Sequence, residues 1–223
     1  SYAKSWTNNH RFNALGGFTM QKTKSVNQWQ RGQGYAADGT EDNNMVAAEK
    51  EATAITSNLQ ETSMVSVLGR LNYDYKRKYY LTFTGRADGA SNFPTGQKWA
   101  FFPSGAFKWA MLQESWMKNL RNTLGEASLR LSFGTSGNQA ISAYGSQAML
   151  TASSNGYVFN GKAPVDYYSS NIPNDNLSWE TSQQWNAGLH LKLVNERVSL
   201  TVDAYNTITR DLLLTVQLPQ QSG

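Results

Sequence analysis

The feature that most restricts the fold of this chain is a regular alternation of apolar and polar residues along segments of about ten residues. From Val65 to Asp88, apolar residues occupy one set of alternate positions and polar residues the other, on both sides of the charged triplet 76–78. A period of two is typical of a β-strand with one buried face, and two such strands around a short turn predict a β-hairpin. The pattern occurs in residues 12–21, 64–75, 79–88, 99–109, 127–135, 184–193 and 198–204.

The connections between these predicted strands differ greatly in length. Residues 76–78 and 194–196 are tight turns, whereas residues 22–63 and 136–183 are long, polar and rich in Gly, Ser, Asn and Gln. If consecutive strands pair antiparallel, both tight turns lie at one end of the sheet and both long loops at the other. This asymmetry is typical of outer-membrane β-barrels, which have short periplasmic turns and longer extracellular loops.

Two connecting segments show helical spacing. Trp116, Met117, Leu120 and Leu124 predict a short amphipathic helix within residues 110–126, at the tight-turn end of the sheet. Residues 44–54 give a weaker helical pattern inside the first long loop.

Three features indicate that the apolar faces meet lipid. The strands have about the 9 to 11 residues that a tilted strand needs to cross a bilayer. Aromatic residues crowd the strand ends, as in the belts at a lipid headgroup boundary. The polar faces carry charged residues that a water-filled lumen accommodates, namely Arg70, Asp74, Arg86, Asp88, Arg130, Lys192 and Asp203. A soluble antiparallel sheet shares the alternation itself, so a soluble β-sandwich that binds carbohydrate is an alternative.

Composition and motifs exclude several other classes of function. The chain has no cysteine and two histidines, which argues against zinc sites and cysteine nucleophiles. The net charge of +4 comes from scattered basic residues, so we expect no nucleic-acid binding. The serine in "FGTSGNQ" (133–139) has no histidine near it in sequence, and "DGTEDNN" (38–44) lacks the glycine and glutamate of an EF-hand. We therefore expect no enzyme activity, no catalytic or metal site and no cofactor.

Several motifs together resemble one known family. The runs "LGRLNYDYKRKYYLTFTGRADGASNF", "WAFFPSGAFKWAM", "SLRLSFGTSGNQAISAY" and "NDNLSWETSQQWNAGLHLKLVNERVSLTVDAYNTITRDLLL" occur in this order. They are similar to the barrel region of the SusC/RagA-type TonB-dependent transporters of Bacteroidetes, from about Phe12 to Gly223. The resemblance implies an antiparallel transmembrane β-barrel segment of seven to eight strands, within a plugged barrel of about 22 strands in the outer membrane.

The resemblance also implies a function and partners. Transporters of this type import oligosaccharides or peptides with energy delivered through TonB, and they work with a SusD-like surface lipoprotein. Residues 1–223 would form part of the barrel domain, with the plug and the closing strands absent, and "SYAKSW" would be the tail of a strand. Residues 22–63 and 136–183 would be its long extracellular loops.

The candidate contacts with cargo lie on the polar faces and in the second long loop. Arg70, Arg86, Asp88 and Arg130 are predicted to face the lumen, and neutralisation of Arg86 and Asp88 by neighbours is the alternative reading. Six aromatic residues occur in the loop: Tyr144, Tyr157, Phe159, Tyr167, Tyr168 and Trp179. Of these, Tyr144 and Trp179 are the candidates for stacking against cargo, although packing within the loop explains them equally well.

Three readings of the function therefore remain. The leading one is part of a nutrient importer in the outer membrane. The others are the soluble carbohydrate-binding sandwich, and a small complete barrel that acts as a passive pore or adhesin.

Overall fold

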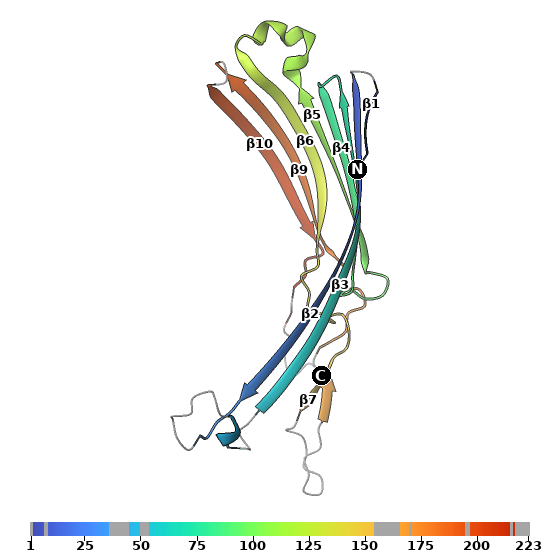
Figure 1. Ribbon diagram of the computed structural model, residues 1–223, viewed down its shortest axis with the longest axis vertical. Helices are drawn as coiled ribbons and strands as arrows, with labels where there is room; N and C mark the ends of the chain where they lie inside the picture. The colour runs from blue at the N-terminus through green and yellow to red at the C-terminus, as the bar shows by residue number, and fades with distance from the viewer. Residues whose placement is uncertain are drawn as a thin grey trace.

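The computed structural model describes residues 2–6, 9–35, 45–49, 54–153, 166–169, 171–194, 197–214 and 216. Eight strands form one antiparallel sheet in which neighbours in the sheet are also neighbours in the chain, apart from a small hairpin inserted between β6 and β9 (Figure 1). In sheet order they are β1 (Tyr2–Trp6), β2 (His10–Arg31), β3 (Ala54–Tyr75), β4 (Tyr79–Ala90), β5 (Trp99–Ala110), β6 (Leu124–Asn138), β9 (Glu180–Leu193) and β10 (Val198–Arg210). The predicted all-β antiparallel class, including the strand tail near the start of the chain, is confirmed.

The register keeps the apolar positions of neighbouring strands side by side. One row crosses the sheet through Phe12, Tyr73, Leu81, Phe107, Leu131, Ala187 and Ala204. The adjacent row consists of Asn13, Asn72, Thr82, Ala106, Ser132, Asn186 and Tyr205. Successive residues of a strand point to opposite faces, so a slip of one residue would move a whole apolar set to the wrong side. The sheet therefore has one continuous apolar face and one polar face.

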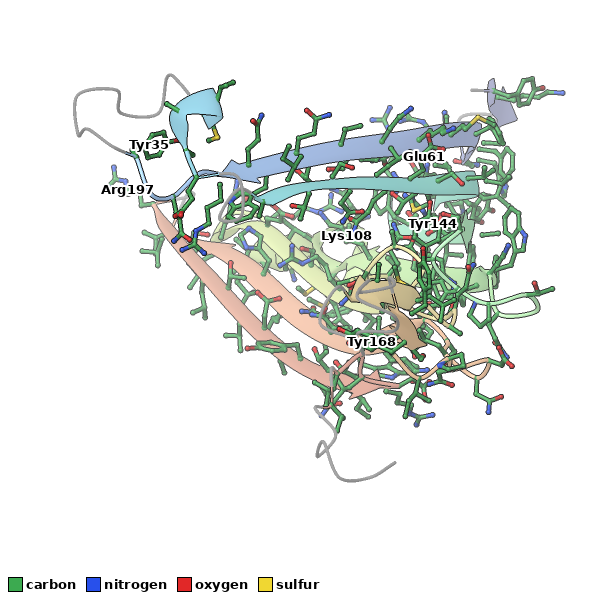
Figure 2. All side chains as sticks on the ribbon, turned by 90° about the horizontal axis from the view of Figure 1, so that it is seen from below. Tyr35, Glu61, Lys108, Tyr144, Tyr168 and Arg197 are labelled. Carbon is green, nitrogen blue, oxygen red and sulfur yellow. The ribbon has the colours of Figure 1, made fainter. Side chains whose placement is uncertain are left out.

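The sheet is curved, and its polar face is concave. Figure 2 shows the strands in an arc, with Lys108 of β5 on the inner side of that arc. The apolar face is convex and solvent-accessible, with Phe18, Phe83, Phe101 and Trp185 each more than half exposed. No second sheet covers this face in the part of the chain that the structure describes, since the remaining hairpin has only two strands. The soluble-sandwich alternative is therefore wrong for this part of the chain.

The sheet is open rather than closed. β1 and β10 lie at its two edges and do not pair with each other. Closure is what removes exposed strand edges from a membrane barrel. These eight strands therefore do not form a small complete barrel.

The two ends of the sheet differ as the strand parity predicts. Residues 76–78 form a tight turn in which Lys76 and Arg77 have φ of 52° and 53°, which matches the primed turns of β-hairpins. β9 ends at Leu193 and β10 begins at Val198 at the same end of the sheet. The described residues of the two long connections, 32–35 and 45–49 in the first and 139–153, 166–169 and 171–179 in the second, lie at the opposite end, in the lower half of Figure 1.

The connection between β5 and β6 differs from its predicted form. It lies at the tight-turn end, as expected, but it contains two 3-10 helices, η4 (Met111–Gln113) and η5 (Ser115–Leu120), and Leu124 already begins β6. A segment of so few residues forms too few α-helical hydrogen bonds to offset the free energy of helix nucleation. Short 3-10 helices are common in such connecting segments. The weaker helical pattern in residues 44–54 corresponds to η2 (Met45–Ala47), and residues 44 and 50–53 lie outside the described residues.

The first long loop is shorter than the sequence pattern predicts. β2 and β3 each have 22 residues, so residues 22–31 and 54–63 are paired strand and not loop. Alternation of apolar and polar residues identifies only a strand that has one apolar face. Residues 22–31 and 54–63 are mainly polar on both faces, so the pattern is lost there although the two strands continue. The boundary predicted at residues 22–63 is corrected by the hydrogen-bonded register of Arg31 with Ala54.

The loops at the far end of the sheet have a small core of their own. Phe93, Phe102 and Trp179 are buried together, and the Trp179 ring lies 4.9 Å from that of Phe93 and 5.6 Å from that of Phe102. The Trp179 Nε1–H donates a 3.1 Å hydrogen bond to the Lys98 carbonyl. The amide of Asn92 donates to the Ile141 carbonyl at 3.1 Å. These contacts fasten the β4–β5 loop to the long β6–β9 connection.

The β6–β9 connection also contains a hairpin that the sequence pattern did not predict. β7 (Leu150–Ser153) pairs antiparallel with β8 (Asp166–Ser169). No helix among the described residues is long and apolar enough to span a membrane.

Candidate functional site

The concave face near the tight-turn end carries a network of charged side chains from β5, β6, β9 and β10. Lys108 Nζ lies 3.2 Å from Glu126 Oε1, and His190 Nε2 lies 3.6 Å from Glu126 Oε2. Next to them, Arg130 Nη2 lies 3.6 Å from Asp203 Oδ1. The side chains of Arg130 and Lys108 are 49 % and 43 % exposed, so both keep donors available to a ligand in the lumen.

Arg86 and Asp88 form a second charged group farther along the same face. Their positions on β4 are two residues apart, which places both side chains on one side of the strand. Arg86 Nε donates to both carboxylate oxygens of Asp88, at 2.7 and 2.8 Å, and Nη2 donates to Ser66 Oγ at 3.1 Å. Asp88 is buried and its charge is neutralised by Arg86, whose own side chain remains 43 % exposed.

Arg70 is the most available cation of the predicted set. Its Nε donates to Thr84 Oγ1 on the neighbouring strand at 3.2 Å, and its side chain is exposed. Among the described residues it forms no ion pair with a carboxylate, unlike Arg86 and Arg130. The planar guanidinium therefore retains donors that suit a carboxylate or a hydroxyl group.

The loop aromatics fall into two groups. Tyr144 is 38 % exposed, has φ of 61°, and accepts a 3.4 Å hydrogen bond from the Glu61 amide. Tyr167 and Tyr168 on β8 are more than half exposed, and Figure 2 shows Tyr144 and Tyr168 over the concave side of the sheet. Trp179, in contrast, is buried in the loop core.

Three parts of the predicted loops lie outside the described residues: the acidic segment 38–44, Tyr157 and Phe159. Elsewhere in the described chain, no group of three or more His, Asp or Glu residues is close enough to hold a metal ion.

The Lys108–Glu126–His190 group is not predicted by any sequence motif. Strand parity places Lys108 on the polar face, but its pairing with Glu126 depends on the β5–β6 register. That register is set across the connection of residues 111–123, and the length of this connection does not predict which residues of β5 and β6 pair.

The structure defines a class of protein. An antiparallel sheet that is apolar on its convex face, charged on its concave face and asymmetric at its two ends is a segment of a transmembrane β-barrel of the outer-membrane type.

The chain belongs to the TonB dependent receptor-like, beta-barrel family, whose model matches residues 1–223. It is 38 % identical over 219 residues to TonB-dependent receptor P3 of Formosa agariphila, covering 96 % of this chain and 21 % of the relative. It is 35 % identical over 198 residues to TonB-dependent receptor SusC of Bacteroides thetaiotaomicron, covering 86 % of this chain and 19 % of the relative. The chain thus spans about a fifth of the length of these relatives.

Solved structures show the same fold. The RagAB peptide transporter superimposes with a TM-score of 0.82 at 27 % identity, over 98 % of this chain and 24 % of the other. The RagAB peptide importer in its "closed-closed" state gives a TM-score of 0.85 at 26 % identity, over 98 % of this chain and 23 % of the other. The predicted SusC/RagA resemblance is confirmed, and with it the placement in the outer membrane.

Proposed function

We propose that this chain forms part of the wall of an active importer that takes up oligosaccharides or peptides across the outer membrane. The importer draws energy through TonB and works with a SusD-like surface lipoprotein. The observation that carries the proposal is the strict separation of the two faces, with an apolar convex surface for lipid and a charged concave surface for the lumen. Family membership and the likeness to SusC and RagAB support the same reading.

Within this wall, the proposed contacts to cargo are those with donors that are not used up by internal pairs. Arg70 and Arg130 offer guanidinium groups to passing carboxylates or hydroxyls, and Tyr144 offers a ring near the mouth. Arg86 and Asp88 contribute mainly to the wall, because they satisfy each other. Trp179 is left out of the contact surface, because its ring packs in the loop core.

Both cargo classes fit this surface. Peptides present carboxylates and a charged backbone terminus, whereas neutral oligosaccharides present hydroxyl groups, and guanidinium donors serve either. The work proposed for the chain is transport, in line with the receptor and transporter class of its relatives.

The test is growth and uptake in the source organism after deletion of the receptor gene. Loss of growth on either a defined oligosaccharide or a peptide digest as sole source would support import and name the cargo class. Unchanged growth and uptake on all of them would contradict the proposal. The deletion strain is then complemented with wild-type receptor, with Arg70→Gln/Arg130→Gln, or with Lys76→Gln/Arg77→Gln.

The two double variants remove the same charge at different places. The turn pair lies at the end of the sheet and outside the concave wall, so we expect it to leave uptake unchanged. The Arg70/Arg130 variant is expected to lower uptake several-fold at equal receptor abundance, because two hydrogen bonds from charged donors are lost. Equal uptake by both variants would contradict the proposal that Arg70 and Arg130 contact cargo. It would not contradict the proposal that the protein is an importer.

A further inference from the structure

The outer surface of the β2–β3 ribbon changes character abruptly at one level. On the convex face, the uninterrupted apolar run of β2 ends at Met20, which pairs with Val65 of β3, and the next apolar pair on this face, Val26 and Leu59, comes only after two lysines. The next position of β2 on the same face is Lys22, followed by Lys24. Both lysines therefore point toward the membrane side of the wall, directly beyond its apolar band, at the end of the sheet that carries the long loops.

A single carboxylate holds these two ammonium groups together. Glu61 lies directly opposite Lys24 in the register, and its Oε1 is 3.7 Å from Lys24 Nζ while its Oε2 is 3.0 Å from Lys22 Nζ. The hydrogen bond from Lys22 is the main cause that lowers the pKa of Glu61 below its ordinary value, so the trio carries one net positive charge. The lysine side chains remain 65 % and 58 % exposed.

Two lysine ammonium groups share one carboxylate in this group, which distinguishes it from the Arg130–Asp203 pair of the concave wall. There, Arg130 faces Asp203 in a one-to-one pair. On the outer face, two ammonium groups carry three N–H donors each, and the oxygens of one carboxylate cannot occupy all of them. The group is therefore prearranged to accept a second anion between Lys22 and Lys24.

The position of the group indicates which anion that is. A rise of about 3.3 Å per residue puts Lys22 roughly 7 Å along the strand from Met20, just beyond the uninterrupted apolar run of the convex face. Cationic side chains beside an anionic bilayer surface gain about 1 kcal/mol each. A lumenal solute or cargo cannot reach this face, because the sheet itself lies between them.

We propose that Lys22 and Lys24 bind the phosphate group of an anionic outer-leaflet lipid, with its acyl chains lying on the apolar convex face below Met20 and Val65. Glu61 positions the two ammonium groups and limits the strength of binding. The proposal rests on the placement of the convex face in lipid and is independent of which cargo is imported.

The test uses the full-length receptor that contains this segment, purified and placed in phosphatidylcholine nanodiscs. Monophosphorylated lipid A is titrated in, and bound lipid is counted by native mass spectrometry. The same lipid with its phosphate removed, and inorganic phosphate as a competitor, are run in parallel. The readout is lipid mass, so it does not depend on uptake of any nutrient.

Three variants are compared in this assay. Lys22→Gln/Lys24→Gln is expected to weaken binding of the phosphorylated lipid at least about tenfold, whereas Glu61→Gln strengthens it several-fold. The matched control Lys76→Gln/Lys118→Gln removes two exposed lysines at the opposite end of the sheet and is expected to leave binding unchanged.

Two results would overturn the proposal. One is that phosphate makes no difference: the Lys22/Lys24 variant and the matched control bind phosphorylated lipid A with equal affinity, or the receptor binds lipid A with and without its phosphate equally. The other is complete displacement of the lipid by millimolar inorganic phosphate, which would assign the group to a soluble anion. Tighter binding by the Glu61 variant separates a phosphate site from a simple ion pair, because a pair without a ligand gains nothing when its carboxylate is removed.

Discussion

Glu114 Oε2 lies 2.8 Å from Lys78 Nζ, and this ion pair joins the β5–β6 connection to the turn between β3 and β4. The other carboxylate oxygen accepts hydrogen bonds from the Tyr79 hydroxyl at 2.7 Å and from Trp109 Nε1 at 3.3 Å. One side chain in a connecting segment therefore holds the start of β4 and the end of β5 together at the tight-turn side of the sheet.

The Glu114 contacts predict a dependence of local order on pH. The hydrogen bonds from Lys78 and Tyr79 lower the pKa of Glu114 from its ordinary 4.5 to about 2. Because the pKa is lower in the folded state, the stabilisation is fully present above about pH 4.5 and is lost as the pH falls toward 2. Hydrogen exchange of residues 111–123, corrected for the intrinsic pH effect, should therefore rise across this window.

Glu114→Gln serves as the control for this prediction. The variant should show faster exchange in residues 111–123 at pH 7, and little further change between pH 5 and pH 2. A wild-type titration as flat as that of the variant would show that this carboxylate does not hold the connection.

The two faces of β5 predict opposite responses to a charge. Phe107 lies on the convex apolar face and Ala106 on the concave polar face, in adjacent rows of the sheet. Phe107→Arg should destabilise the full-length receptor by about 1 to 2 kcal/mol, because the cost of arginine at the lipid face is largest at the bilayer midplane and falls toward the interface that Trp109 marks. Ala106→Arg should cost much less, and the comparison is made by urea unfolding in lipid vesicles. Equal costs would contradict the assignment of the faces.

Arg86 and Asp88 predict a difference between two arginines on the same face. Arg86→Met leaves the nearly buried Asp88 carboxylate without its main partner, which should cost about 1 to 2 kcal/mol after allowance for the exposure of Arg86. Arg70→Met removes an exposed side chain that forms one hydrogen bond and should cost within about 0.5 kcal/mol. Urea unfolding measures the free energy of unfolding of both variants. A larger decrease for Arg70→Met than for Arg86→Met would contradict the view that Arg86 is structural and Arg70 is available to cargo.

The loop core predicts which aromatic residues are structural. Trp179→Ala removes a buried ring together with its hydrogen bond to Lys98 and should lower the stability of the loop unit by about 3 kcal/mol. Tyr168→Ala removes an exposed ring and should have little effect on stability. Protection of residues 90–102 from hydrogen exchange reports the difference. Retained protection in the Trp179 variant would count against the loop core.

The sequence indicated where the strands lie and which way each face points, because alternation is a local property of each segment. Val65, Val67, Leu71 and Tyr73 share a face in any antiparallel pairing that buries them on one side. The parity of the turns then ordered the two ends of the sheet without knowledge of any long-range contact.

The extension of β2 and β3 shows where this reasoning stops. Residues 22–31 and 54–63 carry polar residues on both faces, so no periodicity marks them, and only their mutual hydrogen bonding shows them to be strands. The β7–β8 hairpin was missed because its two strands have only four residues each. Trp179 illustrates the converse: its position in a polar loop left stacking against cargo and packing within the loop equally open, whereas contacts with Phe93 and Phe102, far away in the sequence, bury it.

The sequence by itself determined the class of fold, the two-faced wall and the family, since these follow from residue periodicity and ordered motifs. Only the tertiary structure decided which charges are paired. The partners of Glu126, Glu114 and Glu61 come from other strands or from a distant turn, and their distances depend on register and sheet curvature. Those quantities arise from contacts summed over the whole sheet, which no local pattern encodes.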